Sequence, residues 1–201
     1  MPQAAIDAEI GGTLVLGVRV EETGKVDKVW ITAGPAWPCG KTPQKAINKL
    51  ADTLSDTMKN VKFTPAIHNG KAVTENVAVT IKLDNPKLPP DPLKVDVVGG
   101  RTNSTLANMG VVLGGRAVSM PKPAYPPSAR EVRAGGPVAV QVVIDEDGKV
   151  MRAGAVTGAP ELQYAAREAA CEAKFSKTTL NAKPIKVSGN VIYHFVAPPI
   201  R

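Results

Sequence analysis

The sequence predicts an α+β protein in which a ββαβ unit (two hairpin strands, a helix and a final strand) occurs twice in tandem. Two observations support this prediction: an internal repeat, and a change from alternating to helical apolar spacing within each copy. At 201 residues, 43% of them hydrophobic and 21% charged, the chain has the composition of a globular protein of one or two domains. Aromatic residues are only 4%, so the cores must consist mainly of Val, Ile, Leu and Ala.

The repeat is clearest in two blocks. GTLVLGVRVEETGKV (Gly12–Val26) aligns without a gap to GPVAVQVVIDEDGKV (Gly136–Val150), 124 positions further on, and six of the fifteen residues are identical. The similarity resumes at an offset of 112, where residues 61–83 match residues 173–195. The difference between the offsets means that the first copy has about twelve extra residues, which we place near residues 34–46.

The hairpin strands of the second copy follow from their residues. Apolar residues alternate from Val138 to Ile144, the period of a strand with one buried face. Asp147-Gly148 supplies the positive φ that a tight hairpin turn requires. A second strand is therefore expected over residues 150–156.

The helix and the last strand of this copy are expected next. Pro160-Glu161 favours a helix start, because Pro suits the first helical position and Glu the positive end of the dipole. A narrow, Ala-rich helix face is predicted to pack on the sheet, with Phe175 at its end. This face comprises Leu162, Ala165, Ala166, Ala169 and Ala173. The last strand should cover residues 185–196.

The first copy is expected to have the same plan. Its strands are predicted over residues 14–21, 26–33 and 73–83, and its helix over residues 43–60. Thr42 is the expected N-cap, with Pro43 first in the helix. The predicted inner face of this helix consists of Ile47, Leu50, Leu54, Met58 and Val61.

These elements divide the chain into three parts. Residues 1–84 form the first domain and residues 116–201 the second. Residues 85–115 contain NPKLPPDP and Gly-Gly pairs, a composition typical of a linker. Short edge strands over residues 95–98 and 111–118 are compatible with this interpretation.

Several motifs suggest chemistry that their details exclude. GPAWPCGKT resembles a phosphate-binding loop, but Gly34 and Gly40 enclose five residues instead of four, and Pro35 and Pro38 lack amide donors. Asp145-Glu146-Asp147-Gly148 has hairpin rather than EF-hand spacing. We therefore expect no enzyme activity, cofactor or metal site.

The cysteines and the charge allow fewer conclusions. Cys39 and Cys171 have no metal-ligand spacing, and they either pair in an oxidising compartment or remain separate thiols. The net charge of +7 comes from scattered residues, with few aromatics to stack on bases. Nucleic-acid binding is therefore not expected. His194 is expected to face solvent on a strand.

The second copy resembles the C-terminal domain of TonB-type energy transducers, a fold related to that of TolA. The residues that support this resemblance are Tyr125-Pro126, Ala129, Gly136, Asp147-Gly148, Leu162, Phe175 and Tyr193–Phe195. The first copy matches more weakly, lacks a Tyr-Pro and contains the insertion.

The resemblance implies a periplasmic module that adds a peptide of an outer-membrane TonB-dependent transporter to its sheet and transmits energy to that transporter. It also implies inner-membrane motor proteins and an inner-membrane anchor, reached through an N-terminal segment absent from this sequence. The expected partner-binding edge is Val187, Ser188, Gly189, Asn190, Val191, Ile192 and Tyr193. The alternative is a structural or adaptor protein of the cell envelope without a motor link. A domain-swapped homodimer is compatible with an edge strand near the terminus.

Overall fold

The computed structural model describes residues 1–88, 93–94 and 116–198, and these fall into two compact units. The first unit comprises residues 1–37 and 41–88; the second comprises residues 38–40 and the chain from residue 89 onward. Most of the predicted linker, including the proposed strand over residues 95–98, lies outside the described residues. At its start, however, Asn85 is buried within the first unit.

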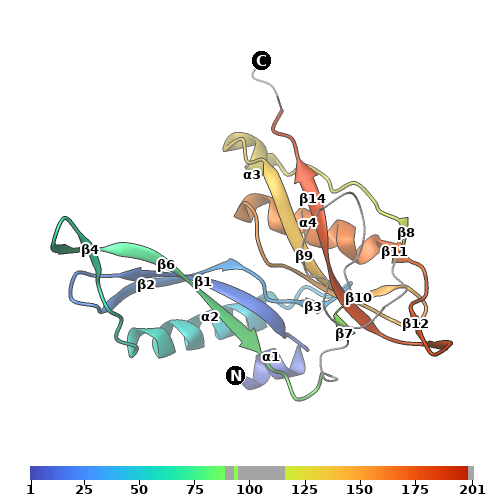
Figure 1. Ribbon diagram of the computed structural model, residues 1–201, viewed down its shortest axis with the longest axis horizontal. Helices are drawn as coiled ribbons and strands as arrows, with labels where there is room; N and C mark the ends of the chain where they lie inside the picture. Colours follow the sequence, from blue (N-terminus) through green and yellow to red (C-terminus); the bar gives the residue numbers. More distant parts are fainter. Residues whose placement is uncertain (89–92, 95–115, 199–201) are drawn as a thin grey trace. The chain divides into compact units, whose positions relative to one another are not determined.

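The first unit is a three-stranded antiparallel sheet with one main helix packed against it (Figure 1). The strands are hydrogen-bonded in the order β2-β1-β6. The elements of this unit are α1 (Gln3–Asp7), β1 (Gly12–Val20), β2 (Val26–Ala33), α2 (Gln44–Lys59), β4 (Ala66–His68), β5 (Lys71–Val73) and β6 (Glu75–Leu83). This confirms the ββαβ order and adds a short helix in front of it.

The start and inner face of α2 differ from the prediction. Pro43, not Thr42, is the N-cap residue, and no side chain caps the helix. The helix buries Ala46, Leu50 and Met58, whereas Val61 lies beyond the helix and is 40% exposed. The predicted face was therefore too long at its C-terminal end, because the helix stops before Val61.

The second unit repeats this arrangement around a larger sheet, whose strand order is β3-β10-β9-β14-β7. Its elements are β3 (Trp37–Pro38), of which only Pro38 is assigned to this unit, β7 (Leu93–Lys94), β8 (Ala117–Ser119), α3 (Pro127–Glu131), β9 (Gly136–Ile144), β10 (Val150–Ala155), α4 (Pro160–Glu172), β11 (Lys174–Phe175), β12 (Thr179–Leu180), β13 (Lys183–Pro184) and β14 (Val187–Phe195). The expected α+β fold is confirmed.

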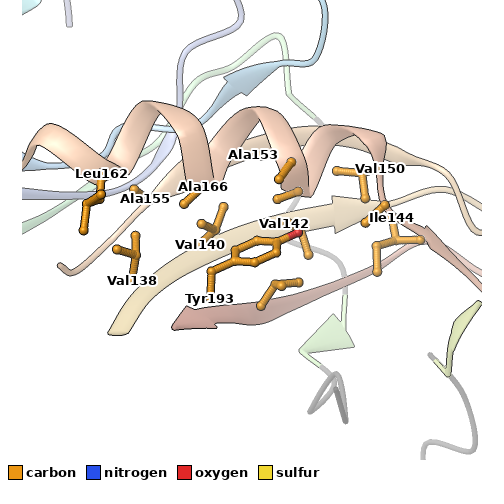
Figure 2. Close-up of a cluster of buried hydrophobic side chains, with 14 of the residues drawn as sticks. Val138, Val140, Val142, Ile144, Val150, Ala153, Ala155, Leu162, Ala166 and Tyr193 are labelled. Atoms are coloured by element: carbon orange, nitrogen blue, oxygen red, sulfur yellow. The ribbon is translucent and has the colours of Figure 1, made fainter. Parts of the chain in front are cut away.

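The core of the second unit lies between α4 and the inner face of the sheet (Figure 2). Val138, Val140 and Val142 on β9 are each 0% exposed, as their alternation predicted. They pack with Leu162 and Ala166 of α4 in one buried cluster. Small residues on this helix let it lie close to the sheet, so a narrow face is enough to exclude water.

The two units share backbone details that the sequence blocks did not include. Glu9 and Arg133, 124 positions apart, both have positive φ, of 54° and 53°. Each follows a five-residue helix with a fully buried alanine, Ala5 in α1 and Ala129 in α3. The structural correspondence therefore begins earlier in the chain than the sequence similarity did.

Candidate functional site

The candidate site is the outer edge of β14 in the second unit. This strand pairs antiparallel with β9 over its whole length, from Val187 opposite Ile144 to Phe195 opposite Gly136. On its other side, β7 pairs in parallel with Val187 and Ser188. Within the described part of the chain, no strand pairs with that side from Gly189 to Phe195.

All seven residues predicted for the site lie on β14, but they do not have the same surroundings. Val187 and Ser188 are already opposite Leu93 and Lys94 of β7. The unpaired edge therefore starts at Gly189, two residues later than predicted, and continues two residues beyond Tyr193 to the end of β14 at Phe195. The parallel pairing of residues 93–94 with β14 could not be predicted, because nothing in the linker sequence indicated a strand there.

From Asn190 to Phe195, the side chains of β14 alternate between solvent and core, and the buried ones hold the strand in place. Val191, Tyr193 and Phe195 are no more than 7% exposed, and the ring centroids of Phe195 and Tyr125 are 6.2 Å apart. These contacts anchor the strand from one side. An added strand would therefore find the hydrogen-bonding groups of this edge already in an extended strand.

The opposite face of β14 carries the residues that a bound strand would meet beside the edge. Asn190, Ile192 and His194 are exposed there, and Ile192 is 38% exposed. An amide, an aliphatic group and an imidazole in a row offer both apolar and hydrogen-bonding contacts. His194 faces solvent, as predicted.

Tyr193 adds an unusual feature behind the edge. Its hydroxyl is buried and has no hydrogen-bond partner among the described residues. Burial raises the pKa of Tyr193 to about 12, and the negative charge of Glu172 adds to this shift. The phenol is therefore neutral at physiological pH and helps to close the core.

The cysteines, left open by the sequence, form a disulfide within the second unit, with 5.5 Å between the Cα atoms of Cys39 and Cys171. Arg167, which was not among the predicted site residues, is buried beside it on α4. Burial lowers the pKa of the Arg167 guanidinium, and the carboxylate of Glu168 opposes that shift. An Arg in an otherwise Ala-rich helix was the only signal for it in the sequence.

The described residues contain no group of three or more His, Cys, Asp or Glu side chains able to hold a metal ion. None of their helices is both long and apolar enough to cross a membrane.

Residues 121–196 match the family model for the C-terminal domain of Gram-negative bacterial TonB proteins. No curated protein matches the chain at a significant level. The matched range contains α3, β9, β10, α4 and β14, and it thus includes the complete candidate edge. The match does not extend to the first unit. The chain therefore carries, over residues 121–196, a domain of the Gram-negative bacterial TonB protein C-terminal family.

Proposed function

We propose that the second unit captures an extended segment of an outer-membrane TonB-dependent transporter on the β14 edge and so serves energy transduction to outer-membrane transport. The observation that supports this most is the outer edge of β14 from Gly189 to Phe195. On the side away from β9, no described strand pairs with these residues. The edge lies within the range that matches a protein-interaction family. Unpaired backbone groups at a sheet edge provide hydrogen bonds for an added strand.

Side chains beside the edge would select the partner. Backbone hydrogen bonds are alike for most sequences, so choice must come from contacts such as those available at Asn190, Ile192 and His194. An extended segment with apolar residues at alternate positions would fit Ile192. Any link to inner-membrane motor proteins would run through a segment outside this sequence.

The disulfide supports a periplasmic location. Disulfides form and persist in oxidising compartments, the bacterial periplasm among them, and are rare in the cytosol. The Cys39–Cys171 bond is thus consistent with the compartment in which a TonB-type domain meets outer-membrane transporters.

We also propose that the first unit is a divergent copy of the same domain. Its central strand order, β2-β1-β6, corresponds to β10-β9-β14 of the second unit. The Tyr-Pro of the second unit has no counterpart in the first, where Met1-Pro2 occupies the equivalent place. The first unit would therefore keep the scaffold without the partner-binding role.

A pair of matched variants tests the β14 proposal in the full chain. Ile192→Lys places a charge beside the β14 edge, where charged residues disfavour strand addition. Thr80→Lys is its control, because Thr80 lies 112 positions earlier, exposed on β6. Calorimetric titration with peptides from transporter N-termini should show about tenfold weaker binding for Ile192→Lys, a loss of about 1.4 kcal/mol, and unchanged binding for Thr80→Lys. Equal affinities for both variants would refute capture at β14.

A further inference from the structure

The edge of the second unit's sheet opposite β14 is covered by residues that come from a distant part of the sequence. Residues 38–40 lie between β2 and α2 in the chain but belong to the second unit. There, β3 is hydrogen-bonded to β10, and the N–H of Cys39 donates to the carbonyl oxygen of Met151 at 2.9 Å. This segment thus occupies the place of an added strand.

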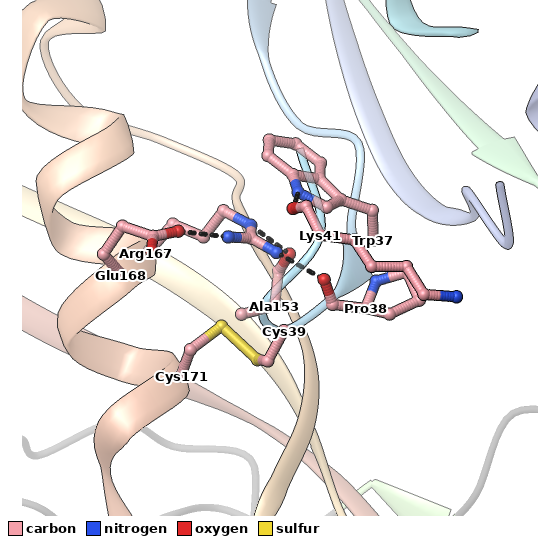
Figure 3. Close-up of a disulfide and its surroundings, with 8 residues drawn as sticks. All are labelled: Trp37, Pro38, Cys39, Lys41, Ala153, Arg167, Glu168 and Cys171. Atoms are coloured by element: carbon pink, nitrogen blue, oxygen red, sulfur yellow. Dashed lines mark hydrogen bonds and ion pairs between the residues drawn. A yellow bond between two sulfur atoms is a disulfide. The ribbon is translucent and has the colours of Figure 1, made fainter. Parts of the chain in front are cut away.

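Arg167 of α4 connects β10 to the segment that covers its edge (Figure 3). Its side chain is 2% exposed and is paired with the carboxylate of Glu168. Its Nε donates to the carbonyl oxygen of Ala153 at 3.1 Å, and its Nη2 donates to that of Pro38 at 3.0 Å. Pro38 has no N–H to offer to β10, so the guanidinium supplies a donor that a regular strand would have supplied.

The Cys39–Cys171 disulfide fixes this arrangement covalently (Figure 3). Without it, Cys39 and Pro38 would be held mainly by the hydrogen bonds just described and by the partial burial of Cys39. Each such bond contributes little net stability, because it replaces a bond to water and requires the chain to be ordered. The disulfide is therefore the one covalent link between residues 38–40 and α4 among the described residues.

We propose that the β10 edge is a second interaction surface, that the Cys39–Cys171 disulfide keeps it closed, and that after reduction it accepts residues 38–40 of a second copy of this chain. The contacts above show that these residues fit the edge, and every copy carries them. The indole N–H of Trp37 donates to the carbonyl oxygen of Lys41 at 2.8 Å. This bond closes the base of the loop, so each copy presents it preformed.

Opening requires two electrons and two protons. A dithiol reductant supplies both, becoming a disulfide while Cys39 and Cys171 become thiols. This proposal does not depend on peptide capture at β14, since the two edges lie on opposite sides of the sheet order.

Amide hydrogen exchange of the ¹⁵N-labelled full chain, with and without dithiothreitol, tests the closure. We expect the Cys39 amide to exchange at least tenfold faster after reduction, while β9 and β14 amides keep their rates. The double variant Cys39→Ser/Cys171→Ser should exchange like the reduced chain without any reductant, which controls for effects of the reagent. An unchanged Cys39 amide in both samples would overturn the proposal, because hydrogen bonds alone would then keep the edge closed.

Reoxidation tests the second copy. An equal mixture of ¹⁴N- and ¹⁵N-labelled chains is reduced, concentrated and reoxidised with oxidised glutathione, and disulfide-linked peptides are identified by mass spectrometry. The proposal predicts mixed-isotope links between Cys39 of one copy and Cys171 of the other, increasing with protein concentration. Intramolecular links alone, or intermolecular links that join two Cys39 residues, would overturn the second copy as the partner.

Discussion

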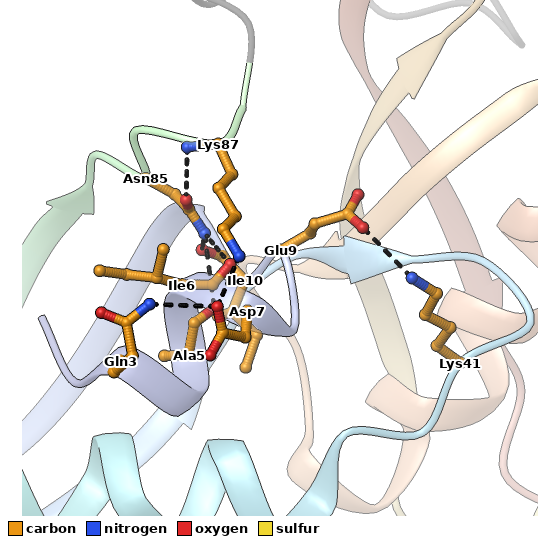
Figure 4. Close-up of polar contacts among 9 residues, drawn as sticks. All are labelled: Gln3, Ala5, Ile6, Asp7, Glu9, Ile10, Lys41, Asn85 and Lys87. Carbon is orange, nitrogen blue, oxygen red and sulfur yellow. Dashed lines mark hydrogen bonds and ion pairs between the residues drawn. The ribbon is translucent and has the colours of Figure 1, made fainter.

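Both units have the same backbone turn after their short helix, α1 or α3, but hydrogen bonds from different side chains stabilise it. In the first unit the side-chain amide nitrogen of Asn85 lies 2.9 Å from the carbonyl oxygen of Ile10 and 3.4 Å from that of Ala5 (Figure 4). In the second unit the equivalent carbonyls, 124 positions later at Ala134 and Ala129, lie within hydrogen-bond distance of the Tyr125 hydroxyl. Asn85 comes after the last strand, whereas Tyr125 comes before the short helix, so unrelated parts of the chain supply the donor.

The hairpin turns of the two units, in contrast, are stabilised by the same backbone hydrogen bond. Gly24 and Gly148 have φ of 78° and 86°. The carbonyl oxygen of Gly24 accepts a hydrogen bond from the amide of Phe63, and that of Gly148 from the amide of Phe175, at 2.9 and 2.8 Å. A Cβ on either glycine would lie about 2 Å from the same phenylalanine's carbonyl oxygen, at 2.1 and 1.9 Å. The identities Gly24/Gly148 and Phe63/Phe175 therefore have a common physical cause.

The difference coincides with the limits of the family match. The backbone contacts that define the ββαβ scaffold occur in both units, so both adopt it. Tyr125 and the aromatic residues at the end of β14 occur in the second unit alone, and the matched range, residues 121–196, begins just before Tyr125. The first unit thus has the ββαβ scaffold without the family match, whereas the second unit has both.

The largest expected effects come from the shared turn. Gly24→Ala and Gly148→Ala should each lower the free energy of unfolding of their own unit by about 2–4 kcal/mol, because of positive φ and a clash with a carbonyl. β1 lies in the first unit, so its amide signals, followed during denaturation, report on Gly24→Ala. Amide signals of β9 report on Gly148→Ala.

Gly70→Ala is the control for the clash. Gly70 has φ of 75°, but nothing lies within 4 Å of its added Cβ, so only the backbone penalty of about 1 kcal/mol should remain. Equal losses for Gly24→Ala and Gly70→Ala would contradict the importance of the Phe63 contact.

The next effect separates the two units. Asn85→Ala should destabilise the first unit by about 2 kcal/mol, because it removes the side-chain amide of a residue that is only 6% exposed and that donates to the carbonyl oxygens of Ala5, Ile6 and Ile10. Tyr125→Phe, which removes one hydroxyl from a half-buried position, should cost the second unit about 1 kcal/mol. Denaturation with the same two probes measures both. If Tyr125→Phe proved the more costly, the proposed equivalence of the two donors would be wrong.

The smallest effect at neutral pH is expected at Tyr193. Its pKa is about 12 in the folded protein and about 10 in an unfolded chain. The raised pKa means that stability from the neutral phenol is complete below pH 10 and is lost as pH rises toward 12, by about 2 kcal/mol. Tyr193→Phe should remove this loss and leave stability at pH 7 unchanged or slightly higher. A wild-type unfolding curve that does not change between pH 9 and 12 would refute the shift.

Much of the fold could be predicted because the local signals were strong. The strand over residues 26–33 matches β2 (Val26–Ala33), and the helix predicted to start at Pro160 does so. Alternation and proline placement act within a few residues, so the sequence alone is enough to detect them.

The remaining features depend on contacts between distant residues. Asn85 was assigned to a linker because its neighbours are prolines, yet it bonds to residues about 80 positions earlier. Cys39 and Cys171 are 132 residues apart, and no spacing rule pairs them. The first two residues of β14 were predicted to be open, because the β7 pairing also comes from far away. The sequence therefore predicted which strand carries the candidate edge, but it did not predict the first and last residues of that edge.

Of the two similar edges, those of β14 and β6, only the β14 edge is expected to bind a partner. The most direct test is an NMR titration of the ¹⁵N-labelled full chain with a transporter N-terminal peptide, in which β14 and β6 amides are followed together. We predict that amides from Gly189 to Phe195 shift and gain protection from exchange, while those of Glu75–Leu83 do not change. Shifts confined to β6, or no shifts on either strand, would contradict it.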